Sequence, residues 1–229
     1  MKINLPLVLG LLVFVSGFKM QTKKKLLFFG DSITQQGAGA DGYIKKMDSI
    51  LTQKNQAANY ELIGAGVSGN KIYDLYLRME EDVLAKNPDA VVIFIGVNDV
   101  WHKRTSGTGT DPDKFEKFYN AIIKKLKDKN IAVYLCTPAS IGEKTDFTNP
   151  LDGDLNNYAA IIRRIATTNN CTLIDLRQAF LDYLKTHNPE NKDRGILTVD
   201  GVHLNRTGNI FVAGKMFDVL QQGFFKFLK

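Results

Sequence analysis

Short apolar runs alternate along this chain with longer stretches of helical periodicity. The runs that predict strands are apolar or β-branched and lie at residues 25–30, 58–64, 89–96, 131–137 and 171–176. The amphipathic stretches that predict helices lie at residues 42–54, 72–86, 112–129, 155–169 and about 209–228. Regular alternation of this kind predicts a parallel sheet with helices on both faces.

One compact domain fits this pattern. The chain has 229 residues, of which 44% are hydrophobic and 24% charged, and it contains no Pro/Gly/Ser-rich linker. The run at residues 89–96 is apolar after its first residue, as expected of a strand that is buried on both faces. We therefore predict an α/β domain with about five parallel strands.

The first residues differ from this domain in pattern. A lysine is followed by an apolar run from Leu5 to Val15 and then by the small residues Ser16 and Gly17. A bilayer span needs about 20 apolar residues, so the pattern predicts a signal peptide at residues 1–17 rather than a transmembrane helix. Export to a periplasm or the medium follows, with a domain at residues 18–229 that has no stable membrane span; an uncleaved anchor and a buried N-terminal helix are the alternatives.

Cysteine and charge add two smaller expectations. Cys136 falls at the end of one predicted strand and Cys171 at the start of the next, about 15 Å apart at about 3.3 Å per residue, so we predict two buried free thiols. The net charge of +6 comes from scattered lysines without interleaved aromatic residues. This pattern predicts a solvated surface and no nucleic-acid binding, with an acidic polysaccharide or anionic surface as the alternative.

Ligands of such sheets bind beyond the carboxyl ends of the strands. The loop after the second predicted strand contains GxGxxG at Gly64, Gly66 and Gly69. A dinucleotide-binding loop would follow the first strand, with an acidic residue at the tip of the next strand about 20 residues on, and neither condition is met. The loop therefore does not match a dinucleotide-binding site, and a nucleotide-dependent enzyme is kept as an alternative that cofactor titration would test.

Acyl-transfer chemistry fits these loops better. Ser32 follows the first predicted strand, where it is either a nucleophile or a helix cap. His203 comes three residues after Asp200, a spacing that lets the carboxylate orient the imidazole. The alternative is that Asp200 and Asn205 only shape a glycine-rich turn. His102 is the rival base, and His187 lies in a polar surface stretch.

Three donors are available for an oxyanion. They are the Asn98 side chain, the Gly69 N–H and the N–H of Ser32 itself. The alternative is that Asn98 only shapes a turn.

Taken in order, GDSIT (30–34), the glycine after the second strand, GVND (96–99) and DGVH (200–203) resemble the blocks of the SGNH (GDSL-type) hydrolase superfamily. The resemblance implies a flavodoxin-like three-layer α/β/α sandwich and a serine esterase or acylhydrolase that needs no cofactor or metal. It implies Ser32 as nucleophile, His203 as base, Asp200 as its orienting acid, and Gly69 and Asn98 as oxyanion donors. One departure is Gly64, which stands where the family often has asparagine.

The substrate is less defined than the chemistry. We expect the segments at residues 102–113 and 138–154 to border the pocket, because loops beyond the strand ends carry specificity. Both segments are polar, which favours a short acyl group on a polar alcohol, and we expect an acetyl esterase acting on glycans. Asp31, Trp101 and His102 are candidate substrate-binding residues. The alternatives are a lysophospholipase or longer-chain esterase, with Trp101, Tyr73 and Tyr43 lining an acyl channel, and a non-catalytic glycan-binding domain. The sequence does not give the oligomeric state.

Overall fold

A parallel sheet of five strands forms the centre of the computed structural model, which describes residues 22–225. The strands lie in the order β2-β1-β3-β4-β5, which is the order of flavodoxin-like folds. Their bounds are β1 (Lys24–Gly30), β2 (Tyr60–Gly66), β3 (Ala90–Phe94), β4 (Ala132–Cys136) and β5 (Thr172–Ile174). The predicted α/β class, with about five parallel strands, is confirmed.

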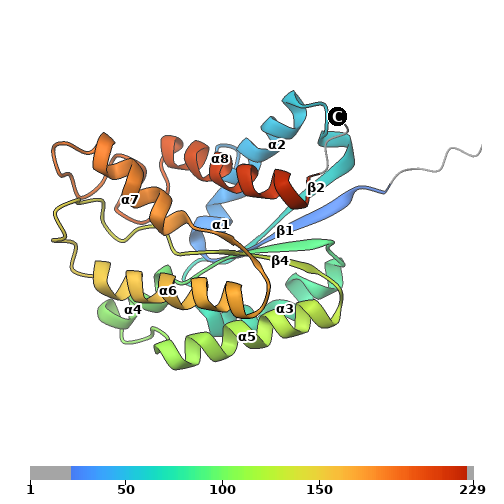
Figure 1. Cartoon of the computed structure of the whole chain (residues 1–229), viewed down its shortest axis with the longest axis horizontal. Coiled ribbons are helices and arrows are strands. Elements are labelled where there is room, and N and C mark those ends of the chain that lie inside the picture. Colours follow the sequence, from blue (N-terminus) through green and yellow to red (C-terminus); the bar gives the residue numbers. More distant parts are fainter. Residues whose placement is uncertain (1–21, 226–229) are drawn as a thin grey trace, which may run out of the picture.

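Helices cover both faces of the sheet, as Figure 1 shows. The first layer consists of α1 (Ser32–Gly37), α2 (Tyr43–Gln53), α7 (Leu176–His187) and α8 (Arg206–Gly223). The second layer consists of α3 (Ile72–Asp82), α4 (Val97–Thr105), α5 (Pro112–Asp128) and α6 (Asp152–Thr168). Two short 3-10 helices, η1 (Ala57–Asn59) and η2 (Leu84–Lys86), precede β2 and β3.

Alternating side chains of the central strands divide the interior into two apolar cores. In β1, Leu26 and Phe28 pack toward α2 and α8, whereas Leu27 and Phe29 pack toward α3 and α5. Every residue of β3 is buried, which explains why its sequence carries no polar position. Burial on both faces fixes the strand register and, with it, the place where each strand ends.

Three helices were not predicted from periodicity. The six residues of α1 are too few to show a repeat. In α4, Val97 and Val100 are the buried apolar residues of a largely polar segment that was expected to be a loop. The buried Leu176, Phe180 and Leu184 of α7 do follow the helical i, i+4, i+8 spacing, so this helix was detectable.

Several element boundaries also differ from the prediction. The helix expected at residues 72–86 ends at Asp82 and gives way to η2. The last helix, expected at about 209–228, begins at Arg206 and ends at Gly223, and residues 226–229 lie outside the described part.

The two thiols are free, but only one of them is buried. Cys136 ends β4 and is fully buried, while Cys171 lies directly before β5 and is half-buried. The expectation of two buried thiols is therefore wrong for Cys171, because β5 is the edge strand of the sheet and protects its start on one side only.

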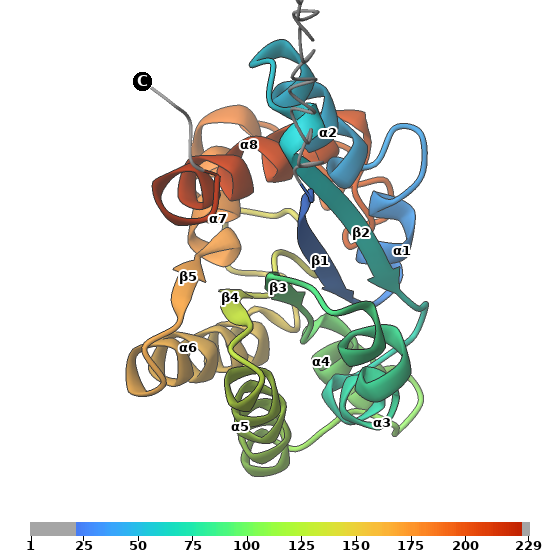
Figure 2. The same cartoon turned by 90° about the vertical axis from the view of Figure 1, so that its right-hand side faces the viewer.

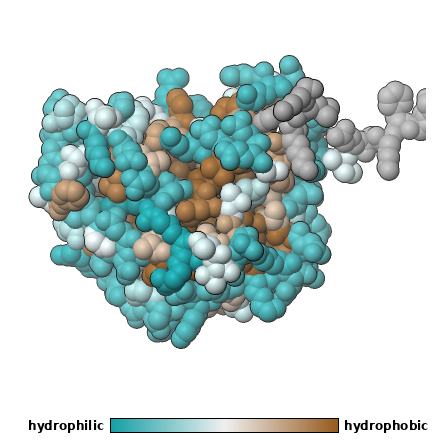
Figure 3. Space-filling model, in the orientation of Figure 1, coloured by the Kyte–Doolittle hydropathy of each residue, from teal (hydrophilic) through white to brown (hydrophobic). Residues whose placement is uncertain are grey.

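The predicted signal peptide at residues 1–17 lies outside the described residues. Between residues 22 and 225 no helix is long and apolar enough to cross a bilayer. Figure 3 shows that this face of the molecule is mostly hydrophilic, with hydrophobic residues gathered between the two layers of helices.

Candidate active site

The sheet brings the ends of three strands together. Gly30 at the end of β1 pairs with Gly66 of β2 on one side and with Phe94 of β3 on the other. Figure 2 shows β1 between these two strands. The segments that follow the three strands therefore begin side by side, although the sequence separates them by tens of residues.

Ser32 is the first residue of α1, and Asp31 caps that helix. One carboxylate oxygen of Asp31 accepts the Ile33 N–H at 2.9 Å. Among the described residues, the Ser32 N–H has no hydrogen-bond partner. The serine thus combines a hydroxyl with a free backbone donor at a helix N-terminus.

A chain of hydrogen bonds joins Ser32 to the loop before α8. The Ser32 Oγ lies 2.9 Å from Nε2 of His203, and Nδ1 of His203 lies 2.7 Å from Oδ2 of Asp200. A proton on Nδ1 that is held by the carboxylate leaves Nε2 free to accept the serine hydroxyl. The arrangement can activate Ser32 as a nucleophile and stabilise an imidazolium.

Asp200 is held in place by its own turn. Its Oδ1 atom accepts the N–H groups of Val202 and His203 at 2.9 and 2.7 Å. Burial acts to raise the pKa of Asp200, but the hydrogen bonds from His203 and Val202 outweigh it and lower the pKa below its usual range. Asp200 is therefore ionised at neutral pH.

Gly69 and Asn98 lie on adjoining segments. Gly69 has a φ of +76°, which a glycine adopts without strain, and its N–H has no hydrogen-bond partner among the described residues. Asn98 is almost fully buried and donates one amide hydrogen to the carbonyl oxygen of Asn70 at 3.1 Å. This bond fixes the Asn98 side chain against the Gly69 loop and leaves its second amide hydrogen for a ligand.

Two side chains brace the Gly69 loop. Arg78 of α3 donates to the Asn70 side chain at 2.6 Å and to the carbonyl oxygens of Gly30 and Ala65 at 2.8 and 3.0 Å. Gln35 of α1 accepts both the N–H and the hydroxyl of Ser68. The loop is thus tied to β1, β2 and α1 without an asparagine at position 64.

The structure also explains Gly64. A Cβ atom at this position would lie 2.8 Å from the Cβ of Ala38, which is closer than van der Waals contact allows. The segment that follows α1 therefore occupies the space that an asparagine side chain would need.

The other candidate residues, Trp101, His102 and His187, differ in their position relative to the Ser32–His203 pair. Trp101 lies edge-on to His203, with ring centroids 6.4 Å apart. Burial and the charge of Lys71 lower the pKa of His102, and no described residue forms a hydrogen bond with its ring. His187 stacks on Tyr183 at the end of α7. The structure therefore pairs Ser32 with His203 rather than with His102.

Asp31 lies beneath the site rather than in it. Only 2% of this residue is exposed, and burial raises its pKa to about 7, while the Ile33 N–H and the charge of His203 act in the opposite direction. Its carboxylate shapes the turn that presents Ser32.

A cavity of about 350 Å³ adjoins the hydrogen-bonded chain. Trp101, Asp200 and Val202 are among the residues that line it. The segment between β4 and α6, which was expected to border a pocket, forms a wall with six of the lining residues: Ile141, Gly142, Lys144, Thr148, Asn149 and Pro150. The other segment with this expectation, residues 102–113, contributes Lys103, Arg104 and Pro112 to a separate cavity of about 230 Å³.

Sequence reasoning missed Glu143, which joins this wall to the segment that leads into the turn with Asp200 and His203. The residue is fully buried, and its carboxylate accepts the N–H groups of Ile196, Leu197 and Thr198, each at 2.7 Å. No motif marks Glu143, because most of its partners are backbone groups that any sequence would supply. No described group of three or more His, Cys, Asp or Glu side chains is arranged to hold a metal ion.

Comparisons with known proteins agree with this geometry. The model of the GDSL-like lipase/acylhydrolase family matches residues 28–209. An acetylxylan esterase of Geobacillus stearothermophilus is 30% identical over 211 residues, which cover 85% of this chain and 93% of that protein. A GDSL esterase/lipase of Arabidopsis thaliana is 26% identical over 208 residues, covering 82% of this chain and 81% of that one.

Solved structures show the same likeness. The crystal structure of the acetyl xylan esterase AlAXEase has 65% sequence identity and a TM-score of 0.84, and the match covers 85% of this chain and 98% of that chain. The structure of Axe2, an acetylxylan esterase of Geobacillus stearothermophilus, has 28% identity and a TM-score of 0.77 over 92% of this chain and 99% of that chain. The family match spans the segment that carries Ser32, Asn98, Asp200 and His203, and the chain belongs to the GDSL-like lipase/acylhydrolase family.

Proposed function

We propose that the protein is a serine esterase that removes acetyl groups from carbohydrate, with acetylated xylan as the expected substrate class. The observation that carries the chemistry is the hydrogen-bonded chain from Ser32 through His203 to Asp200. The acetylxylan esterases among its relatives support the substrate class.

The proposed reaction has two halves. Ser32 Oγ attacks the acetyl carbonyl carbon while His203 Nε2 takes the hydroxyl proton, and Asp200 stabilises the imidazolium. The N–H groups of Ser32 and Gly69 and the Asn98 amide hold the oxyanion. Collapse breaks the ester bond, and the sugar oxygen leaves with the proton from His203. Water, deprotonated by His203, then attacks the carbonyl carbon of acetyl-Ser32. The bond between this carbon and the Ser32 Oγ breaks, His203 returns the proton to Oγ, and acetate is released.

Two further observations support this assignment. Structures of Axe2 include two that are described as catalytic mutants, one with a serine and one with a histidine replaced by alanine. In addition, the cavity beside Asp200 is lined partly by Lys144, Thr148 and Asn149, which suit a polar alcohol.

The longer-chain esterase is less well supported. Tyr43, a candidate for an acyl channel, is fully buried against the sheet and donates its hydroxyl to Thr34 at 3.0 Å. Tyr73 donates to the carbonyl oxygen of Thr108 at 3.3 Å, outside the cavity lining. A non-catalytic glycan-binding domain would have no use for a serine, a histidine and free oxyanion donors together.

A panel of 4-nitrophenyl esters from acetate to octanoate, measured beside acetylated xylo-oligosaccharides, tests the proposal. We expect the acetate ester and the acetylated saccharides to be preferred, and Ser32→Ala to lose at least about 10⁴-fold in kcat. A preference for octanoate would favour the longer-chain esterase. Full activity in Ser32→Ala would remove the proposed mechanism.

We also propose that the chain is exported and that cleavage after Gly17 leaves one domain at residues 18–229. The support is the pattern of the first residues, a lysine followed by an apolar run and two small residues. Mass spectrometry of the mature protein from the native host tests the cleavage site, and recovery of the whole chain from the cytosol would contradict export.

A further inference from the structure

Phe147 adjoins, in the chain, residues that line the cavity, but it is not itself a lining residue. It directly precedes Thr148, Asn149 and Pro150, which line the cavity beside Asp200. The phenylalanine is 90% exposed, more than any other large hydrophobic side chain that the structure describes. A single exposed apolar side chain is common on protein surfaces, so its exposure alone does not indicate a role.

The backbone of Phe147 supplies a second observation. Its φ is +64°, in the left-handed region, where a bulky side chain is strained. The other non-glycine residues that the structure places in this region are all asparagine, which tolerates it: Asn55, Asn87, Asn130, Asn170 and Asn191. A strained residue persists where the surrounding structure holds it, and such residues cluster at binding and active sites.

Side chains on both sides hold Phe147 in this conformation. Asp146 accepts the N–H and the hydroxyl of Thr148 at 3.1 and 2.6 Å. Asp146 also accepts from the Asn191 amide at 2.6 Å, and Asn191 in turn accepts the Thr145 N–H at 2.7 Å. The phenyl ring makes none of these hydrogen bonds. The network therefore fixes the backbone around Phe147 without needing the ring.

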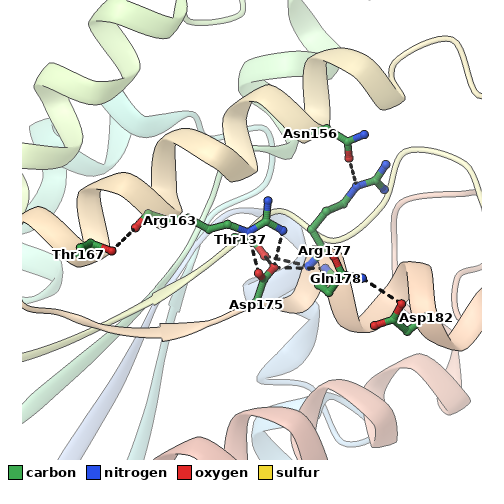
Figure 4. A network of polar contacts seen from close by, with 8 residues as sticks. All are labelled: Thr137, Asn156, Arg163, Thr167, Asp175, Arg177, Gln178 and Asp182. Atoms are coloured by element: carbon green, nitrogen blue, oxygen red, sulfur yellow. Dashed lines mark hydrogen bonds and ion pairs between the residues drawn. The ribbon is translucent and has the colours of Figure 1, made fainter.

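The wall segment is also anchored at both ends. Arg177 of α7 donates to the carbonyl oxygen of Ala139 at 3.2 Å and to the Asp152 carboxylate at 2.6 Å, so one buried guanidinium fixes the start and the end of the segment. Figure 4 shows Arg177 reaching Asn156 of α6, beside the pair formed by Asp175 and Arg163. The wall is therefore a firm support for an exposed ring.

Polar groups of the cavity are available for a ligand. Neither the Lys144 ammonium nor the Asp193 carboxylate forms a hydrogen bond or ion pair with another described residue. Both line the cavity together with the Trp101 ring. Aromatic faces combined with a few polar groups suit a sugar, whose C–H face packs on a ring while its hydroxyls form hydrogen bonds.

We propose that Phe147 is a stacking platform for a sugar ring beyond the acetylated one, so that the cavity beside Asp200 continues into a glycan subsite along the segment 144–150. This inference rests on the proposed carbohydrate esterase function and adds a subsite to it. Phe147 determines affinity for an extended saccharide and takes no part in the chemistry at Ser32.

The test compares Phe147→Asn, which removes the ring but suits the left-handed backbone, with Phe147→Tyr, which keeps a ring. Leu77→Ala on α3 is the matched control, because Leu77 is 76% exposed and does not line the cavity. Each variant is assayed with acetylated xylotetraose and with 4-nitrophenyl acetate, which is too small to reach a second sugar subsite.

We expect Phe147→Asn to raise KM for acetylated xylotetraose about 3- to 10-fold, with kcat and the hydrolysis of 4-nitrophenyl acetate unchanged. Phe147→Tyr and Leu77→Ala should match the unaltered protein on both esters. Thermal unfolding of Phe147→Asn is measured alongside and should show equal or higher stability, because the strain is relieved.

Four outcomes would overturn the inference. An unchanged KM for the saccharide in Phe147→Asn removes the subsite and leaves the esterase proposal intact. An equal loss of activity on both esters would show that Phe147 maintains the structure of the wall and does not bind a second sugar. A change in oligomeric state by sedimentation, without a change in KM, assigns the ring to an interface between copies. If the unaltered protein cleaves no acetylated saccharide, the proposed function itself fails and the subsite with it.

Discussion

The Oε1 atom of Glu143 accepts both the backbone N–H and the hydroxyl of Thr198, at 2.7 and 2.9 Å. Thr198 pairs with Leu204 in a short antiparallel bridge, and the turn between them carries Asp200 and His203. The buried carboxylate therefore holds the base of the loop that carries His203, whose Nε2 lies 2.9 Å from the Ser32 Oγ.

Replacing Glu143 by glutamine should disturb this loop. The amide keeps one oxygen but turns an NH₂ group toward the Ile196 N–H, so a buried donor loses its acceptor, at a cost of about 1–3 kcal/mol in the free energy of unfolding. We expect kcat to fall several-fold with KM little changed, because His203 loses its alignment with Ser32. Urea unfolding and kinetics on 4-nitrophenyl acetate measure both effects.

The matched control is Glu190→Gln, at an exposed glutamate whose one ion pair within residues 22–225 is with Lys192. A surface pair of this kind contributes about 0–1 kcal/mol, so this variant should keep its stability and kcat. Normal kcat in Glu143→Gln would show that Glu143 does not position the catalytic loop.

Removing the Asn98 side chain should weaken stabilisation of the transition state more than binding of the substrate. In Asn98→Ala we expect kcat to fall about 10²- to 10³-fold, as when one oxyanion donor is lost. The lost hydrogen bond to Asn70 adds about 1 kcal/mol of destabilisation. Kinetics with acetylated saccharides and urea unfolding distinguish the two effects.

Asn120→Ala is a suitable comparison, because the Asn120 amide also donates to a backbone carbonyl, that of Glu116, but lies in α5. It should be similarly destabilised and fully active. Equal kcat in Asn98→Ala and Asn120→Ala would assign Asn98 to the turn alone.

The two histidines at the site can be told apart by pH–rate profiles. The lowered pKa of His102 keeps its ring neutral near pH 7. Within residues 22–225, the imidazole that forms a hydrogen bond with Ser32 is that of His203. His102→Ala should therefore retain most of kcat/KM and its pH dependence, whereas His203→Ala should lose at least about 10³-fold. A profile that survives in His203→Ala and disappears in His102→Ala would reverse the assignment of the base.

Asp99 should make stability depend on pH. Burial raises its pKa to about 7 from an ordinary 3.8, against the effects of the nearby Thr110 hydroxyl and the Ile72 N–H, and its Oδ2 atom lacks a hydrogen-bond partner among the described residues. Between about pH 4 and 7 the folded state holds a proton that the unfolded chain has lost. Asp99 therefore makes the free energy of unfolding fall as pH rises through this range. The destabilisation by its buried charge is fully present above pH 7.

Asp99→Asn removes the charge and keeps an oxygen for the Ile72 N–H, which Asp99 accepts at 3.2 Å. The variant should gain more stability relative to the unaltered protein at pH 8 than at pH 5, as measured by urea unfolding. Asp113→Asn, at an exposed carboxylate, is the control and should show no such trend. A gain that is equal at both pH values would contradict the buried ionisation.

The sequence was sufficient to predict the strands and helices whose pattern is set by burial in the core. The apolar runs of β1 and β3 and the amphipathic repeat of α5 follow directly from the faces that the core covers. It was insufficient to predict α1. This helix has only six residues, begins with Ser32, and is fixed by its N-cap rather than by an apolar repeat.

The site divides in the same way. Asp200 and His203 lie three residues apart, so their contact follows from local spacing. Ser32 and His203 lie 171 residues apart, and only the ordered blocks of the family, not any spacing rule, predicted that they meet. Neither the support from Glu143 nor the strained backbone of Phe147 has a sequence signal, because the first depends on backbone donors and the second on a dihedral angle.

The separation of Ser32 and His203 has a consequence for synthesis. During translation, Ser32, Gly69 and Asn98 leave the ribosome long before the turn that carries Asp200 and His203. A chain that has folded only as far as α7 holds the nucleophile and the oxyanion donors but no base, and so cannot hydrolyse an ester in the proposed way. Turnover in the proposed way therefore requires the contact between Ser32 and His203, and recovery of esterase activity during refolding would report when that contact forms.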